Sequence, residues 1–342
     1  MKFEFRKRQG SPQREFNIRT SVNEFIEDKR LQKRSDKTLK TYQQALNHFI
    51  KFVENRELRG DEEVCVRDYI RWLSFEKTKW DDHPTNHSKQ IGVSARTANN
   101  TIRVLRIFYN WCKSRKYIFS NPAENAQYQT EEDEGFEILT TDEVKAILAV
   151  PNRRTYTGNR DYIMLMLMID TGMRVGEMSA LVRGDIDLVY RQITIRAEIT
   201  KGRRLRTVPI SSTTANLLRE LFDYIGISDE DADEYIFLTQ FGERYFGDTF
   251  AKMIRKYANK ADRVIKGRPS PHTFRHYFAI NYLKNGGTPF SLMTILGHTD
   301  MTMTQKYVRY AESDLIEIHE KASPAESLLN GNVKKRGSIR FK

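Results

Sequence analysis

Residues 271–276 read Pro-His-Thr-Phe-Arg-His, and a helix is predicted over residues 273–285. Three other short clusters lie on either side of this stretch. They are Thr-Gly-Met-Arg-Val-Gly-Glu at 171–177, Thr-Lys-Gly at 200–202, and Leu-Gly-His at 296–298 with Tyr307 nine residues further on. The four clusters contain the candidate functional residues, which are Arg174, Glu177, Lys201, His272, Arg275, His298 and Tyr307.

Most of these residue types have a specific use at a phosphodiester. The planar guanidiniums of Arg174 and Arg275 could hold the non-bridging oxygens and stabilise the charge of a pentacoordinate transition state. The two histidines titrate near neutrality and can exchange protons, and Lys201 on a hairpin could protonate a leaving oxygen. Tyr307 is a nucleophile once its proton is removed. Its phosphate ester conserves the energy of the broken bond, so such a reaction needs neither ATP nor metal.

Each of these residues also has a structural interpretation. Arg174 could lie on the surface, and His272 and Arg275 could simply line a helix start. His298 could be a turn residue, and Tyr307 could belong to a core with its apolar neighbours. The order of the four clusters along the chain is what favours a functional interpretation.

That order of an arginine, a hairpin lysine, His-x-x-Arg, Leu-Gly-His and a tyrosine nine residues on resembles the tyrosine recombinase (integrase) family. The resemblance covers about residues 137–322 and is looser in the helical segment before them. It implies a site-specific recombinase that cleaves and rejoins DNA through a 3′-phosphotyrosine, without a cofactor. By the same resemblance, Tyr307 is the nucleophile, and Arg174 and Arg275 bind the scissile phosphate.

The resemblance also assigns the remaining site residues. Lys201 is the general acid for the 5′-hydroxyl leaving group, and His272 assists proton transfer to and from the tyrosine. His298 is the second histidine at the phosphate, Glu177 supports the site, and His276 is left as a structural residue.

Two of these assignments have competitors close by in the sequence. Tyr310 lies one helical turn beyond Tyr307, and the family's spacing favours Tyr307. Arg203 and Arg204 crowd Lys201, which precedes the turn glycine as the family's lysine does. We interpret these two arginines as DNA contacts.

Apolar residues recur at three- and four-residue steps between residues 18 and 122, which predicts four or five amphipathic helices. Arg96, Arg103 and Arg106 interleave with the apolar stripe of the fourth helix. This basic face could lie on DNA phosphates or could be an ordinary solvated face. Later in the chain, alternating apolar residues at 192–210 predict a β-hairpin.

The predicted fold is mainly α with a small antiparallel β-sheet, in two domains that form a C-shaped clamp on DNA. We expect five segments: a basic flexible N-terminus (1–16), a helical core-DNA-binding domain (17–122), an acidic linker (123–136), a catalytic domain (137–322) and a basic C-terminal tail (323–342). A protein that synapses two DNA sites should form a homo-tetramer on DNA and be a monomer in solution. The sequence is compatible with tyrosine attack in cis and in trans.

The net charge of +12 favours a polyanionic partner, with double-stranded DNA ahead of an acidic membrane surface. No run approaches the roughly 18 apolar residues of a membrane span, and the charged first eight residues are unlike a secretory signal. Cys65 and Cys112 are expected to be reduced structural thiols. We therefore expect a cytoplasmic, nucleoid-associated protein that uses no membrane and no small-molecule substrate.

Three other functions compete with recombination. A metal-dependent nuclease or transposase needs clustered carboxylates, which the His and Arg motifs lack, so no metal is expected. The zinc-pair spacing of His272 and His276 is disfavoured because Arg275 puts a cation beside the pair. A type IB topoisomerase-like relaxation of DNA shares the tyrosine chemistry, and a catalytically silent DNA-binding protein shares the fold.

Overall fold

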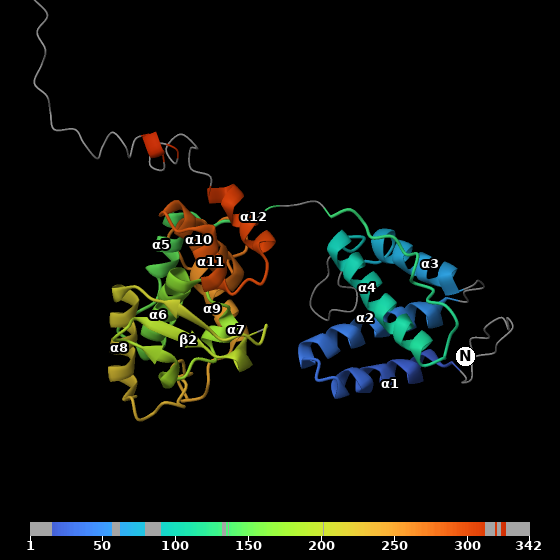
Figure 1. Cartoon of the computed structure of the whole chain (residues 1–342), viewed down its shortest axis with the longest axis horizontal. Helices are drawn as coiled ribbons and strands as arrows, with labels where there is room; N and C mark the ends of the chain where they lie inside the picture. The colour runs from blue at the N-terminus through green and yellow to red at the C-terminus, as the bar shows by residue number, and fades with distance from the viewer. Residues whose placement is uncertain are drawn as a thin grey trace, which may run out of the picture. The chain divides into compact units, whose positions relative to one another are not determined.

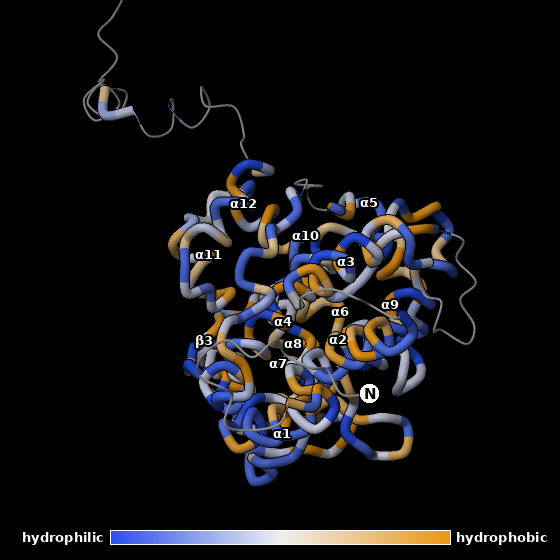
Figure 2. The backbone as a smooth tube through the Cα atoms, turned by 90° about the vertical axis from the view of Figure 1, so that its right-hand side faces the viewer, coloured by the Kyte–Doolittle hydropathy of each residue, from blue (hydrophilic) through white to orange (hydrophobic). Residues whose placement is uncertain are grey.

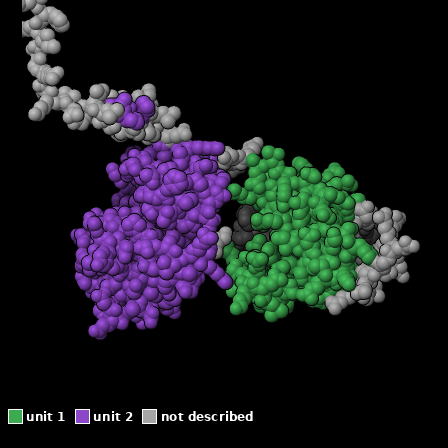
Figure 3. Space-filling model, viewed as in Figure 1, with its two compact units in different colours: residues 1–134 green, residues 135–342 purple. Residues whose placement is uncertain are grey.

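The computed structural model of the chain describes residues 16–56, 62–78, 90–131, 135, 137–200, 202–311, 319 and 323–325. Nearly all of the basic N-terminus, Lys201, and most of the C-terminal tail therefore lie outside the described residues. The chain divides into two compact units, residues 1–134 and residues 135–342, coloured green and purple in Figure 3. Each unit is described by itself.

Unit 1 is helical. Its helices are α1 (Ile18–Leu31), α2 (Asp36–Asn55), α3 (Glu62–Phe75) and α4 (Ala95–Ser114), labelled in Figure 1. Polar side chains start three of them: those of Asn17, Ser35 and Ser94 accept hydrogen bonds from backbone N–H groups of the first turn. Figure 2 shows apolar and polar residues alternating along the helices, as the sequence predicts for amphipathic helices.

Aromatic side chains fill the core of unit 1. Phe25 contacts Phe108 and Trp111 edge-on, with ring centroids 5.5 and 5.6 Å away, and Phe49 packs edge-on against Tyr69 at 4.9 Å. Each such pair contributes about 0.5–1.5 kcal/mol beyond its buried area. The rings come from all four helices and tie them into one bundle.

The first part of the expected linker packs on α4. Arg106 donates hydrogen bonds to the backbone carbonyls of Ala123 and Ala126. Further along, the side chain of Asn99 donates to the Gln129 carbonyl at 2.9 Å and accepts from the Gln129 N–H at 2.7 Å. Residues 123–129 are therefore held on unit 1.

Unit 2 combines helices with a small sheet. In chain order the helices are α5 (Thr141–Leu148), α6 (Tyr156–Thr171), α7 (Val175–Met178), α8 (Ser212–Ile225), α9 (Gly247–Ala258), α10 (Pro271–Lys284), α11 (Pro289–Leu296) and α12 (Met301–Ala311). The strands β1 (Ile186–Asp187), β2 (Gln192–Ile195) and β3 (Arg206–Pro209) form an antiparallel sheet in the order β1-β2-β3. The predicted hairpin is β2–β3, in which Ile193 pairs with Val208.

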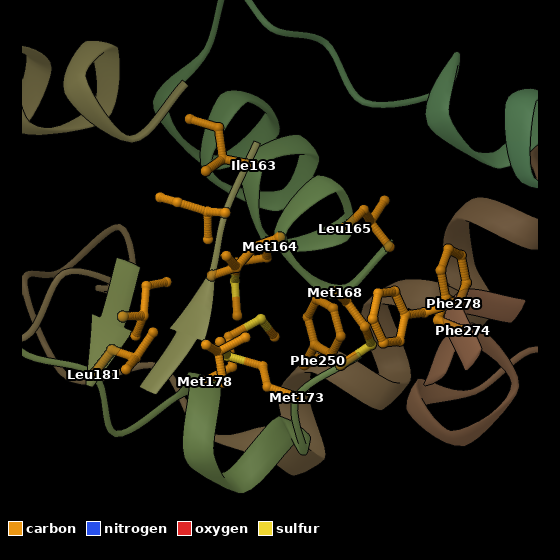
Figure 4. Close-up of a cluster of buried hydrophobic side chains, with 14 of the residues drawn as sticks. Ile163, Met164, Leu165, Met168, Met173, Met178, Leu181, Phe250, Phe274 and Phe278 are labelled. Carbon is orange, nitrogen blue, oxygen red and sulfur yellow. The ribbon is translucent and has the colours of Figure 1, made fainter. Parts of the chain in front are cut away.

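The apolar helix α6 runs through the core of unit 2. Its residues Met164 and Met168 are fully buried, and Figure 4 shows them among Phe250 of α9 and Phe274 of α10. Thr140 and Glu143 form a capping box at the start of α5.

Glycines end the two helices that lead into the site. Gly172 ends α6 and Gly297 ends α11, both in the left-handed conformation with φ of 58° and 64°. A Cβ at Gly172 would lie 2.2 Å from the Phe278 ring, so no other residue fits there without rearrangement.

Cys65 and Cys112 are both buried, and no disulfide joins them. Among the residues that the structure describes, no helix has the length and apolar character needed to cross a membrane.

Candidate active site

The turn after α6 carries Arg174 and Glu177. Arg174 has extended backbone (φ −70°, ψ 143°) immediately before α7, and Glu177 lies one turn into that helix. The Glu177 carboxylate accepts hydrogen bonds from the backbone N–H and from Nη1 of Arg174, both at 3.0 Å. These hydrogen bonds hold one edge of the Arg174 guanidinium. The Arg174 side chain is still 32% exposed, so it can bind a ligand.

A second arginine, Arg206 of β3, holds the same carboxylate from the other side. Its Nη1 and Nη2 donate to the two oxygens of Glu177 at 3.1 and 2.7 Å, and its Nε donates to the Ile295 carbonyl at 2.9 Å. Burial alone would raise the pKa of Glu177, but the hydrogen bonds and charge of Arg206, helped by Arg174, outweigh burial and lower it. Glu177 is therefore an ionised, buried link between α7 and β3.

The sequence interpretation missed Arg206, although a signal was present. Residues 206, 208 and 210 fall on one face of the strand, and Val208 and Ile210 are apolar and buried. An arginine on the same face as these buried residues points into the protein. It therefore needs a buried carboxylate as its partner.

Arg275 of α10 is buried, with only 6% of the residue exposed. Its Nη1 donates to the Gly172 carbonyl at 2.7 Å, and its Nη2 donates to the Leu296 carbonyl at 2.9 Å. These carbonyls lie at the C-terminal ends of α6 and α11, where helices leave acceptors unpaired and carry partial negative charge.

The charge of Arg275 is not matched by a carboxylate. Among the described residues, no ion pair includes it, and the neighbouring Arg174 adds a second positive charge. Burial, followed by the repulsion from Arg174, lowers the pKa of Arg275 to about 10. A buried cation of this kind favours a bound anion.

His298 follows the glycine that ends α11. Its Nε2 lies 3.1 Å from Nη2 of Arg275, and its Nδ1 lies 3.0 Å from Oγ1 of Thr304. Because a guanidinium can only donate, Nε2 is the acceptor, and the ring proton sits on Nδ1. Burial, then the charges of Arg275, Arg174 and Arg206, lowers the pKa of His298 to about 4, so the ring is neutral at neutral pH.

Tyr307 of α12 lies against two histidines. Its hydroxyl is 3.0 Å from Nδ1 of His276, and its ring stacks on that of His298 with centroids 6.3 Å apart. Burial raises the pKa of Tyr307, and the charges of Arg275 and Arg174 act in the opposite direction. Tyr307 is 5% exposed, whereas Tyr310 is 37% exposed.

The other predicted residues of unit 2 lie around this cluster or outside the description. His272 is exposed at the start of α10, near enough for its charge to lower the pKa of His276. Lys201 belongs to the residues that the structure does not describe. Arg203 and Arg204, which follow it, are exposed.

The three arginines proposed for DNA contact in unit 1 have different surroundings. The Arg96 side chain is 86% exposed and lies 3.5 Å from Glu131, and Arg103 is exposed with a hydrogen bond to Asn100. Together with Tyr128, these residues line a hollow beside α4. Arg106 differs, because its guanidinium is used to hold residues 123–126 and stacks on Tyr128.

Unit 2 thus brings Arg174, Glu177, Arg275, His298 and Tyr307 into one site from α7, α10, α11 and α12. Two arginines face a nucleophilic hydroxyl, so the site can bind a phosphate and attack it. Within the described ranges, no group of three or more His, Cys, Asp or Glu could hold a metal ion.

Comparison with known families agrees with this geometry. Residues 137–314 match the model of the phage integrase family, and residues 22–118 match the model of the phage integrase N-terminal SAM-like domain. The tyrosine recombinase XerD of Staphylococcus saprophyticus is 26% identical over 308 residues, covering 89% of this chain and 99% of the relative. The tyrosine recombinase XerC of Chlamydia trachomatis is 29% identical over 262 residues, covering 76% and 78%.

Solved structures share the fold at lower identity. The Tn1549 transposon integrase in complex with transposon right end DNA gives a TM-score of 0.63 at 17% identity, covering 90% of this chain and 100% of that one. A lambda integrase dimer bound to a COC′ core site gives a TM-score of 0.67 at 16% identity, covering 87% and 79%.

Proposed function

This chain belongs to the phage integrase family and is a tyrosine recombinase, and we propose that it exchanges DNA strands at specific sites through a covalent link between Tyr307 and a 3′-phosphate. The Tyr307 oxygen attacks the scissile phosphorus, and the bond from phosphorus to the 5′-oxygen breaks. Rejoining is the reverse attack by a 5′-hydroxyl. The phosphotyrosine conserves the bond energy, so neither ATP nor a metal ion takes part.

One observation carries this proposal: Arg275 is buried beside Arg174 without a carboxylate partner among the described residues, within range of the Tyr307 hydroxyl. A non-bridging phosphate oxygen would satisfy the buried charge. The two guanidiniums would then stabilise the charge that develops in the transition state, which is commonly the largest contribution to catalysis.

The other residues complete the proposed mechanism. His298 would hold a phosphate oxygen or orient Arg275, and Glu177 would keep Arg174 in place. Lys201 would protonate the 5′-oxygen, and His272 would assist at the edge of the site. The roles of Lys201 and His272 follow from the family resemblance alone. Those of His298 and Glu177 are also supported by their hydrogen bonds to Arg275 and Arg174.

We also propose how the rest of the chain serves this reaction. Residues 17–122 would bind the core DNA site, residues 137–322 would form the catalytic domain, and together they would close on duplex DNA. Arg96, Arg103, Arg203 and Arg204 would contact phosphates, and Arg106 would shape that surface. The protein would be a monomer in solution, and four protomers would assemble on two synapsed DNA sites. Binding to DNA would associate the protein with the nucleoid.

The proposal is tested with a suicide duplex that is nicked beside the cleavage position, so that religation fails. DNA from the flanks of the gene serves as substrate, and the products are run on a denaturing gel without added metal. Wild-type protein should give a band shifted by the mass of the chain. Tyr307→Phe should bind DNA and give no covalent band, because the phenylalanine ring retains the packing and lacks the nucleophilic oxygen.

Tyr310→Phe is the matched control, since it makes the same change one turn further along α12 and should leave the covalent band intact. A covalent band from Tyr307→Phe would refute the assignment and transfer it to Tyr310. Cleavage of random-sequence DNA as fast as of the flanking site would indicate a topoisomerase-like activity. No cleavage of any DNA, despite salt-sensitive binding, would indicate a silent DNA-binding protein.

A further inference from the structure

We propose that His276 is a catalytic residue of this reaction and accepts the Tyr307 proton as the bond from tyrosine to phosphorus forms. The inference deepens the proposed function and rests on it. Neither the cluster order nor the family resemblance gave His276 a role, since both directed attention to His272.

The contact between α10 and α12 is the basis of the proposal. Nδ1 of His276 lies 3.0 Å from the Tyr307 hydroxyl, a hydrogen-bond distance to the reacting atom itself. The two rings are 5.6 Å apart between centroids. His272, by contrast, is exposed one turn earlier on α10.

Arg275 and His276 are adjacent on α10, but their side chains point in different directions. Successive residues of a helix point about 100° apart. Arg275 can therefore reach the carbonyls of Gly172 and Leu296, while its neighbour His276 meets Tyr307. Arg275 also hydrogen-bonds the Tyr307 hydroxyl, and because a guanidinium can only donate, the tyrosine proton is left to point at His276. The tyrosine oxygen then faces the arginines, where the phosphorus would be.

His276 is in the right protonation state to accept. It is part-buried, and burial lowers its pKa to about 4, with further lowering by the charges of His272 and Arg275. His272 and Arg275 act on it from its own helix, and the Tyr307 hydroxyl faces it from α12. At neutral pH the ring is neutral, so the tautomer protonated at Nε2 offers a lone pair at Nδ1.

The proposed step balances as follows. The O–H bond of Tyr307 breaks and the proton moves to Nδ1 of His276, while the tyrosine oxygen bonds to phosphorus. The bond from phosphorus to the 5′-oxygen breaks, and that oxygen takes a proton from the general acid. During rejoining, the proton on His276 returns to the departing tyrosine oxygen.

The test compares His276→Asn and His276→Ala with wild type in single-turnover cleavage of a suicide duplex. The Asn side-chain oxygen lies near the place of Nδ1 and can accept the hydrogen bond but cannot take the proton. Both variants should cleave about 100-fold slower or worse, which is the usual contribution of general base catalysis. Tyr310→Phe, which changes a side chain one turn beyond Tyr307 on α12, is the control and should cleave at the wild-type rate.

A second DNA substrate shows which of the two proton transfers is slowed in each variant. Sulfur in place of the 5′-bridging oxygen is a good leaving group that needs no general acid. Loss of the general acid in Lys201→Ala should therefore be rescued by this substrate, whereas the loss in both His276 variants should persist. DNA binding and thermal melting of each variant report whether it is folded.

The outcomes separate the possibilities. If His276→Asn cleaves at the wild-type rate and His276→Ala cleaves slowly, His276 is a positioning residue, and the proposal that it accepts the proton is wrong. The proposal is also wrong if both variants cleave at the wild-type rate, or if the substrate with the 5′-bridging sulfur restores the cleavage rate of both. Failure of the wild-type protein itself to form a covalent complex would refute the proposed function, and the role of His276 with it.

Discussion

Two histidines of the site, His276 and His298, are held neutral by burial and by neighbouring positive charges, which lower the pKa of each to about 4. In the unfolded chain the same side chains have a pKa near 6.5. Between these pH values the unfolded chain binds protons that the folded protein excludes, so folding becomes less favourable as pH falls. The stability is present above about pH 6.5 and is lost towards pH 4.

We therefore expect the free energy of unfolding to fall as pH is lowered from 7 to 4, by an amount on the order of 2–3 kcal/mol for each histidine. Chemical denaturation at several pH values measures this slope. His298→Asn, which does not titrate, should have a shallower slope between pH 7 and pH 5. The same slope in wild type and variant would contradict the assignment of a neutral, buried His298.

The sequence predicts a contact between two residues when they are close in the chain or belong to a recognisable cluster. Arg174 and Glu177 are three residues apart, so their contact follows from one helical turn. The contact of His276 with Tyr307 joins residues 31 positions apart. It depends on how α12 packs on α10, which no local pattern encodes.

At the scale of elements, Glu177 and Arg206 connect three parts of the site. Arg206 belongs to β3, its carboxylate partner to α7, and the Ile295 carbonyl that it also contacts to α11. Gly297 lies against this arginine, since an added Cβ would be 3.1 Å from its side chain. The hairpin that carries position 201 is thereby fixed to the elements that carry Arg174 and His298.

Replacement of Arg206 should therefore destabilise unit 2 and disturb the site. Arg206→Met leaves a buried carboxylate with one cationic partner fewer, and breaking a buried ion pair costs about 3–5 kcal/mol. We expect a loss of unfolding free energy near the lower end of this range, because Arg174 still contacts Glu177, together with slower cleavage. Urea denaturation and single-turnover cleavage measure the two effects.

Arg204→Met is the control for stability, because Arg204 is exposed on the same hairpin and its loss should cost less than about 0.5 kcal/mol. The double variant Arg206→Met with Glu177→Gln removes both charges and should recover part of the stability. A destabilisation by Arg206→Met no larger than that by Arg204→Met would show that the buried pair contributes little.

Element boundaries follow from sequence where caps and apolar periods agree. The hairpin predicted at 192–210 contains β2 and β3. The helix predicted to end at residue 285 is α10, which ends at Lys284. The short helix α7 was not predicted, since four residues are too few for an apolar period.

The packing of the first part of the expected linker, residues 123–136, does not follow from its composition. Residues 123–129 are held on α4 by hydrogen bonds of Arg106 and Asn99. Arg106 was grouped with the DNA contacts because it shares a helix with Arg96 and Arg103. Sequence spacing placed it on α4 but did not reveal which backbone carbonyls it reaches.

At the scale of the whole molecule, the structure bears on which protomer supplies the nucleophile. Helix α12 packs on α10 and α11 of the same chain, and these three helices are coloured orange to red in Figure 1. Tyr307 consequently lies beside Arg275 and His298 of its own chain, with its hydroxyl hydrogen-bonded to His276. Delivery of the tyrosine to a neighbouring protomer would require α12 to leave this packing and expose a buried ring.

We therefore expect cleavage in cis, and mixing two defective proteins tests it. Tyr307→Phe has an intact phosphate site without a nucleophile, and Arg174→Ala has the nucleophile with a defective phosphate site. If each tyrosine acts only in its own chain, the mixture contains no complete site and should give no more covalent product than Arg174→Ala alone. If α12 crosses between protomers, Tyr307 of the Arg174→Ala chain can attack phosphate held by its neighbour, and the covalent band should reappear. A size tag on the Arg174→Ala chain identifies the protein in such a band, so its appearance would establish trans cleavage and contradict the packing of α12 described here.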